Sequence, residues 1–146
     1  MKKINLSMLP VEKPSSYPRP FDEPCSAQTL QRLARSAGLT QFGVNVTTIE
    51  AGGWSSQRHC HSHEDEFVWV LEGELILVTD TGEETLLPGD CAAFRSGDPD
   101  GHHLVNKSAR AARVLEIGTT SPQDRCTYPD IDLIADAGGV HPHYTP

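Results

Sequence analysis

The stretch RHCHSHEDEFVWVLEGEL, residues 58–75, decides the fold of this chain. From Glu66 onward its apolar residues have the spacing of a β-strand, in which successive side chains point to opposite faces. Counting by two predicts that Glu66, Val68 and Val70 face the interior. The outer face then carries Phe67, Trp69 and Leu71. An aromatic stripe on such a face most often packs against another sheet or a second subunit.

Histidines gather at the start of the same stretch. His59 and His61 are two residues apart, so on a strand both side chains leave one face and Cys60 points the other way. Glu66 is an odd number of residues from His61, so on one continuous strand its side chain would point to the opposite face. The polar residues 62–65 can form a turn, however, and the alternation of faces then begins again on the next strand. Imidazole nitrogens with one carboxylate oxygen suit Zn, Fe, Mn, Co or Ni and discriminate poorly among them. The sequence therefore predicts a site for one divalent metal ion of open identity.

The chain on either side of this stretch has the pattern of an all-β protein. From Phe42 onward, short apolar or alternating runs are separated by turn residues, among them Glu72-Gly73 and Gly89-Asp90. Strands spaced in this way are typical of an antiparallel sandwich or barrel. After Ile117 the alternation is lost and Pro and Gly return, so the C-terminal tail is expected to wrap the barrel surface.

Prolines dominate the beginning of the chain. Residues 1–24 hold five of its eleven prolines, which disfavour helix interiors and central strands. We expect an extended arm there, outside the core. Leu30, Leu33 and Ala34 then have helical spacing, which predicts one short helix over 26–37. The predicted organisation is an arm with this helix over 1–40, a β-barrel over 41–120 and a wrapping tail over 121–146.

The bulk composition limits the classes of protein that remain. A length of 146 residues fits one domain. The formal charge of −8 and pI near 5.2 disfavour nucleic acid and anionic lipid as partners. No apolar run approaches the roughly 20 residues that span a bilayer, and the start lacks a signal-peptide segment, so a cytoplasmic protein is expected. The four cysteines form no CxxC pair and are expected to be reduced thiols.

At these residues the sequence resembles the cupin family. The first cupin motif places Gly, His, His, Glu and Gly at fixed intervals, and the chain matches every interval. The matching residues are Gly53, His59, His61, Glu66 and Gly73. The chain matches the second motif at Gly89, Gly97, His102 and Asn106, with two departures. Arg95 stands where the motif has proline, and the loop after Gly97 is two residues longer.

The longer loop leaves two candidates for the third histidine. His102 keeps the motif's spacing to Asn106, and we prefer it on that ground. His103 is its rival. The resemblance implies a double-stranded β-helix, or jelly-roll, barrel whose metal is held by three histidines and one glutamate. The implied ligands are His59, His61, Glu66 and His102. The remaining coordination positions would be open to water or substrate, as in a catalytic site.

Two functions remain open on the sequence. The first is a metalloenzyme acting on a small organic molecule by isomerase, lyase or dioxygenase chemistry. The segments EDEFVWVLEGEL and GHHLVN resemble a subgroup of small stand-alone cupins, some relatives of which are described as sugar-phosphate isomerases. No cluster of Lys and Arg near the motifs supports phosphate binding in this chain. The second is a non-catalytic small-ligand-binding or sensor module. Arg58 and Arg95 are expected to neutralise nearby carboxylates, with binding of an anionic substrate as the alternative. A homodimer is also expected, with the proline-rich arm lying across the partner's barrel.

Overall fold

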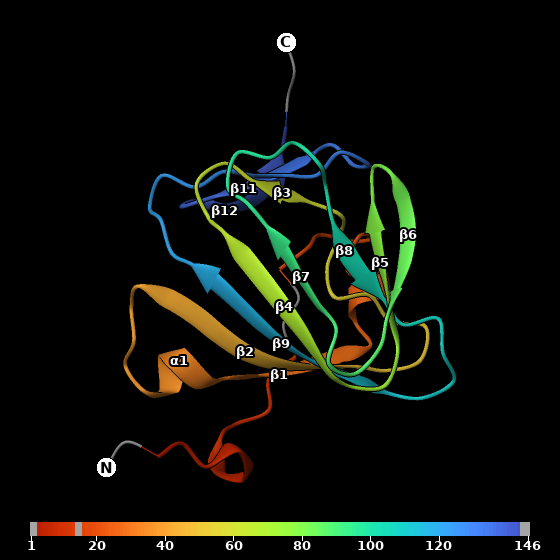
Figure 1. Cartoon of the computed structure of the whole chain (residues 1–146). Coiled ribbons are helices and arrows are strands. Elements are labelled where there is room, and N and C mark those ends of the chain that lie inside the picture. The colour runs from red at the N-terminus through yellow and green to blue at the C-terminus, as the bar shows by residue number, and fades with distance from the viewer. Residues whose placement is uncertain (1–2, 14–15, 144–146) are drawn as a thin grey trace.

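The computed structural model describes residues 3–13 and 16–143, and its architecture is all-β (Figure 1). Every strand pair in it is antiparallel. The largest sheet has the order β1 (Gln28–Arg32), β2 (Phe42–Ile49), β9 (Ala112–Thr119), β4 (Glu66–Glu72), β7 (Cys91–Phe94). A three-stranded sheet has the order β6 (Gly82–Leu86), β5 (Leu75–Thr79), β8 (His103–Val105). A four-stranded sheet has the order β12 (Gly139–Pro142), β11 (Leu133–Asp136), β10 (Cys126–Thr127), β3 (Cys60–His61).

The main core lies where the five-stranded and three-stranded sheets face each other. Its buried side chains alternate along β4, β5 and β9, as expected for strands with one face inward. Val68 and Val70 belong to this core, while Trp69 and Leu71 are 45% and 38% exposed. The predicted parity of the 66–72 strand is therefore confirmed at these four positions. The finer prediction of a double-stranded β-helix, and the boundaries at 40 and 120, stay predictions.

Gly73 makes the turn from β4 to β5 fit against β9. Its φ of +79° lies in the left-handed region, and a Cβ there would come within 2.8 Å of the Ala112 Cα. Any other residue would be strained and would also push the hairpin away from the first residue of β9. The glycine that ends the first histidine motif thus has a packing reason to be there.

The predicted helix over 26–37 is wrong in its first half. Gln28–Arg32 forms β1, which pairs with β2 from Gln28 opposite Ile49 to Arg32 opposite Asn45. The helix α1 covers only Leu33–Ser36. Leu30 is buried in the strand, and an apolar residue at its spacing from Leu33 also suits the inner face of a helix, so the spacing did not distinguish the two. Five paired residues along the edge of β2 outweigh the weak local preference for a helix.

The proline-rich segment lies against its own chain where the structure describes it. Two 3-10 turns, Leu6–Met8 and Glu23–Cys25, interrupt it. Tyr17 and Phe21 pack on a second apolar cluster, formed by Cys126, Tyr128 and Leu133 near the four-stranded sheet. The expectation of an arm outside the core therefore does not hold for residues 16–25, because these aromatic side chains supply apolar area that the small sheet needs to bury.

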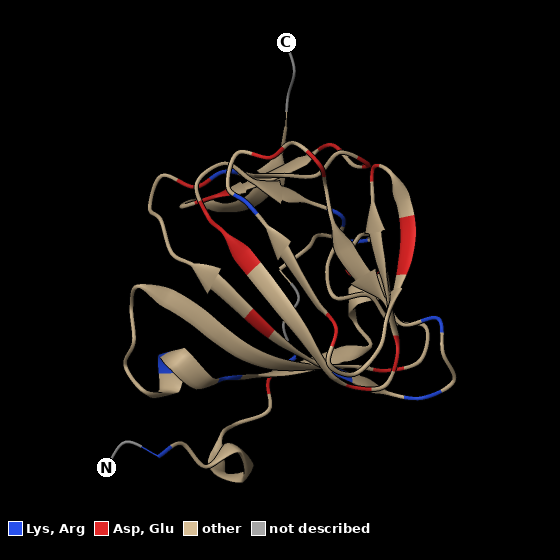
Figure 2. Ribbon diagram, in the orientation of Figure 1, with Lys and Arg blue, Asp and Glu red and all other residues tan. Residues whose placement is uncertain are grey.

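In the part of the chain that the structure describes, no helix is long and apolar enough to cross a membrane. Acidic residues lie along many of the loops and strand ends, whereas basic residues are fewer and scattered (Figure 2). This distribution agrees with the formal charge of −8.

Candidate metal centre and cavity

Backbone pairing brings two histidines from distant segments side by side. His59, next to β3, and His102, next to β8, form an isolated antiparallel bridge. The His59 N–H donates to the His102 carbonyl at 3.1 Å, and the His102 N–H donates back at 2.8 Å. Their rings lie 4.7 Å apart between centroids. His61 extends from β3 on the same side, with its ring centroid 5.0 Å from that of His59.

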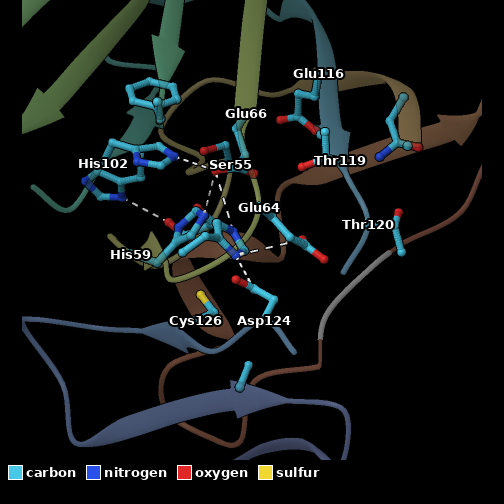
Figure 3. A pocket seen from close by; sticks show the side chains of 18 of the residues that line it. Ser55, His59, Glu64, Glu66, His102, Glu116, Thr119, Thr120, Asp124 and Cys126 are labelled. Carbon is cyan, nitrogen blue, oxygen red and sulfur yellow. Dashed lines mark hydrogen bonds and ion pairs between the residues drawn. The ribbon is translucent and has the colours of Figure 1, made fainter. Parts of the chain in front are cut away.

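The carboxylate of Glu66, the first residue of β4, lies at the centre of the three rings (Figure 3). Its Oε2 is 2.7 Å from the His102 Nε2, 3.4 Å from the His59 Nε2 and 3.5 Å from the His61 Nε2. The structure thus brings together all four residues that the motifs singled out. The turn at residues 62–65 does interrupt the alternation of faces, since the side chains of His61 and Glu66 meet although an odd number of positions separates them.

Two of these rings are oriented by hydrogen bonds on their far side. The His59 Nδ1 donates to the Gln57 carbonyl at 2.9 Å, and the His61 Nδ1 donates to the Asp124 carboxylate at 2.6 Å. Because neither oxygen acceptor can supply a proton, the Nδ1 atoms carry it. The Nε2 atoms then turn toward Glu66. When the ring is neutral, this proton position leaves the Nε2 lone pair free, as a metal-ligating histidine needs.

His102 is held by packing instead. The ring of Phe94 stacks on it in parallel, with centroids 3.5 Å apart and planes 1° apart. The His102 Nδ1 is buried without a hydrogen-bond partner among the described residues, so only its Nε2 is engaged. His103 lies elsewhere: its Nδ1 donates to the Ser56 carbonyl at 2.9 Å, and its ring meets Trp54 edge to face. Of the two rivals, the structure brings His102 to Glu66.

The cluster changes the pKa of its members. Burial opposes ionisation of Glu66, but hydrogen bonds from His102, His59 and His61 hold the pKa of this carboxyl well below its usual range. Burial disfavours a charged His61, yet the hydrogen bonds and charges of Glu66 and Asp124 raise its pKa to about 9. Burial dominates at His102 and lowers its pKa. A carboxylate that stays ionised beside imidazoles is the electrostatic environment that attracts a cation.

A cavity of about 610 Å³ opens beside the cluster. His59, His61, Glu66 and His102 all line it, so the cluster is reachable by a small molecule. Its wall also carries several carboxylates, among them Glu64, Glu116, Asp124 and Asp136. Among the described lining residues there is no Lys or Arg. A second, smaller cavity of about 280 Å³ reaches His61, Glu66 and His102 from another side.

Glu116 is a cavity residue that the sequence patterns missed. It sits on β9 and accepts a hydrogen bond from the Thr47 hydroxyl at 2.8 Å. Burial raises its pKa to about 7, and among the described residues it forms no ion pair. A charged residue within the alternating run RVLEIG was the one available signal. Asp124 and Cys126 had no such signal, because their segment has no period to count.

The two arginines of the sequence analysis do not line the larger cavity. Arg58 forms ion pairs with Asp130, at 2.8 Å, and with Asp80, which confirms that it neutralises nearby carboxylates. Arg95 lines the smaller cavity together with Asp98 and Asp100.

Among the residues that the structure describes, three combinations of His, Cys, Asp and Glu have donor atoms close enough to share an ion, within 4.8 Å of one another. They are His59 with Glu66 and His102, His59 with His61 and Cys126, and His61 with Glu64 and Asp124. The first contains three of the four predicted ligands. His61 joins it through its 3.5 Å approach to Glu66.

Comparison with known proteins agrees with this fold. Residues 45–118 match the cupin domain family. Among solved structures, a protein from Silicibacter pomeroyi, described as a sugar phosphate isomerase of the cupin superfamily, is 42% identical. Its TM-score is 0.90, over 95% of this chain and 90% of that one. No curated protein matches the chain.

Two more distant structures share the fold alone. The polyketide cyclase RemF from Streptomyces resistomycificus is 20% identical with a TM-score of 0.68, over 83% of this chain and 80% of that one. A cupin 2 conserved barrel domain protein from Salinispora arenicola is 16% identical with a TM-score of 0.58, over 83% and 88%. The family match over half of the chain, together with the 42% identical structure, shows that this chain belongs to the cupin superfamily.

Proposed function

We propose that this cupin is a metal-dependent enzyme for a small organic molecule, with one divalent ion held by His59, His61, Glu66 and His102. The observation that carries the proposal is the approach of three Nε2 atoms to one Glu66 oxygen, all within 3.5 Å. Hydrogen bonds among these four residues alone would not require the Nδ1 protons of His59 and His61 to be held on the far side. That arrangement favours an ion between the rings.

The donor set fits a borderline divalent ion and does not select among Zn, Fe, Mn, Ni and Co. The carboxylate supplies one negative charge, and three neutral imidazoles supply lone pairs without further charge. Asp124 adds a second carboxylate behind His61, an arrangement that raises ligand basicity. When bound, such an ion acts as a Lewis acid toward a carbonyl, hydroxyl or water. The protein's own residues supply position and proton chemistry.

Glu116 is the residue best placed to hold a proton in the cavity. Its carboxyl faces the cavity, and one of its oxygens is anchored by Thr47. A pKa of about 7 lets the group both give and take a proton near neutral pH. Isomerase and lyase reactions require this kind of transfer, which leads us to favour them over dioxygenase chemistry.

The Silicibacter pomeroyi protein is described as a sugar phosphate isomerase, and its likeness to this chain makes the same activity a hypothesis here. The described residues of the cavity wall favour a neutral sugar as substrate over a sugar phosphate, because they include Glu64 and Glu116 and no Lys or Arg. A phosphate dianion would lose its hydration next to these carboxylates without a basic partner. We therefore propose a neutral polyhydroxylated substrate.

The experiment is a metal analysis followed by proton exchange. Protein purified without added metal should hold close to one ion per chain, and His61→Ala should remove most of it. The loaded protein in deuterated water is then incubated with D-fructose or fructose 6-phosphate, and deuterium incorporation is followed by NMR. Incorporation into the neutral sugar that disappears in Glu116→Gln supports an isomerase. Metal binding with no exchange in either sugar would instead favour a ligand-binding or sensor module.

The outer face of the large sheet supports a homodimer. The strand register places Val44, Ile117 and Phe67 side by side, with Trp69 next to Leu115 in the following row. Phe42 and Trp69 on this face are 40% and 45% exposed. We propose that a second copy covers this face, rather than the arm of a partner, since the described arm packs on its own chain.

The four cysteines are consistent with a reducing compartment. All are free in the structure, and two of them, Cys25 and Cys126, are buried. Because disulfides persist mainly in oxidising compartments, we propose a cytoplasmic location.

A further inference from the structure

Cys126 lies beside the histidine cluster although no motif points to it. It is the first residue of β10, which pairs with β3 so that Cys126 stands opposite His61. Residues opposite each other in an antiparallel pair have Cβ atoms about 5 Å apart. The Cys126 sulfur, drawn in Figure 3 near His59 and Asp124, lies within 4.8 Å of a ring nitrogen of each histidine on this side, His59 and His61. Its side chain is 6% exposed and lines the larger cavity.

This position distinguishes Cys126 from the other three cysteines. Cys60 points to the opposite face of β3, where its sulfur lies 3.1 Å from the Thr127 hydroxyl. Cys25 is buried at the end of a 3-10 turn, and Cys91 is exposed on β7. Among the described residues, only Cys126 belongs to a group of three potential metal donors that includes a thiol.

The two overlapping donor groups differ in chemistry. His59 with Glu66 and His102 offers nitrogen and carboxylate oxygen, which suit Mn, Fe and Zn. His59 with His61 and Cys126 offers nitrogen and sulfur, which suit thiophilic ions. His59 is common to both groups, and its Nδ1 is engaged by the Gln57 carbonyl, so the two positions compete for one ion. The nature of the ion then decides between them.

We propose that Cys126 is a sulfur ligand that gives the centre a second, thiophilic position, formed by His59, His61 and Cys126. This inference rests on the proposed metal site and adds a residue to it. The thiol proton leaves when the sulfur binds the ion, because coordination deprotonates a thiol. A hard ion such as Mn²⁺ uses Glu66 and leaves Cys126 unbound. A soft ion such as Cd²⁺ takes the sulfur.

The test is Cd²⁺ titration of metal-free protein, read by the ultraviolet absorption that a thiolate gives when it binds cadmium. We expect this absorption to saturate at one equivalent. Cys126→Ser should abolish it and weaken Cd²⁺ binding by about tenfold or more, while Mn²⁺ affinity stays within about twofold. Matched controls are Cys25→Ser, Cys60→Ser and Cys91→Ser, which should keep the absorption. Cys126→Ala, with thermal unfolding of both variants, separates ligand loss from misfolding.

Each outcome decides a different point. Cd²⁺ binding without thiolate absorption, or absorption that survives in Cys126→Ser, overturns the inference and leaves the four-residue site standing. An equal loss of Mn²⁺ and Cd²⁺ affinity in both Cys126 variants shows a structural role for Cys126 and also overturns it. If the wild-type chain binds neither ion, the proposed function itself fails.

Discussion

The Nδ1 of His61 lies 2.6 Å from the Oδ2 of Asp124, although the two residues are 63 positions apart in the chain. Asp124 also accepts a hydrogen bond from the backbone N–H of His63 at 2.8 Å, which holds its carboxylate in place. The carboxylate can therefore orient the ring of His61. This contact comes from a segment without secondary-structure period, and it aims the other nitrogen of His61 at Glu66.

Replacing Asp124 by Asn should weaken metal binding without removing a ligand. Asparagine keeps the shape but loses the charge that orients His61 and raises its basicity, so we expect about a 10- to 100-fold loss of affinity. Competition with a chelator of known affinity measures it. Asp136→Asn is the matched control, since Asp136 lines the same cavity but pairs with His141. Equal affinity in Asp124→Asn and wild type would contradict the role of Asp124 in orienting His61 and raising its basicity.

His102→Ala and His103→Ala should differ sharply in metal content. His102 reaches Glu66 at 2.7 Å, whereas His103 is bound to Ser56 and packs on Trp54. We expect His102→Ala to lose most of the ion and His103→Ala to keep it, with some loss of thermal stability because a buried ring is removed. Elemental analysis of both proteins decides. Metal loss only in His103→Ala would reverse the assignment.

Glu66→Gln should bind metal weakly and regain any activity when metal is in excess. The change keeps the shape but removes the negative charge at the centre of the three rings, so affinity falls while the histidines remain. Metal occupancy and turnover are measured together over a range of metal concentrations. Full occupancy with activity lost for good would instead show that Glu66 acts as an acid or base.

Glu116 should make stability depend on pH with a predictable sign. Its pKa is raised from 4.5 to about 7, so between these values the folded protein keeps a proton that the unfolded chain has lost. The folded state is therefore favoured at low pH, and this advantage is lost as pH rises from about 4.5 to about 7. Relative to Glu116→Gln, the wild type should lose up to about 3 kcal/mol of unfolding free energy across this window.

Urea unfolding of both proteins at pH 5 and pH 8 measures this difference. The groups that influence the pKa of Glu116, besides its burial, are Thr47 through a hydrogen bond and Glu66, His59 and Arg32 through their charges, and none of them is substituted in the comparison. A difference between the two proteins that is the same at both pH values would contradict a raised pKa at Glu116.

Trp69→Glu should separate the proposed dimer into monomers. A charge on the apolar outer face is costly to bury in an interface but is hydrated in a monomer, since Trp69 is 45% exposed in the single chain. Light scattering at micromolar concentration is the measurement. Leu87→Glu, at another exposed position, is the control and should leave the mass unchanged. A monomeric wild type would reject the dimer.

The sequence by itself determined the strand pattern and the residues that meet at the centre, apart from the choice between His102 and His103. A strand repeats every two residues, so the parity of Val68 and Trp69 and the shared face of His59 and His61 are local properties that spacing records. The family motifs add Glu66, through its spacing to His61, and favour His102, through its spacing to Asn106. These features can be predicted from the sequence without knowledge of any distant contact.

Only the tertiary structure decided the features that depend on pairing between distant segments. Gln28–Arg32 is a strand because β2 pairs with it, although its local pattern also fits a helix. His102 rather than His103 reaches Glu66 because the backbone bridge to His59 sets the direction of its side chain. Asp124, Cys126 and Glu116 become neighbours of the cluster through pairing of β10 with β3 and of β9 with β4. A contact between strands that are not adjacent in the chain, or that adjacent segments form only on pairing, depends on how the sheets close on each other, and no short sequence pattern carries that register.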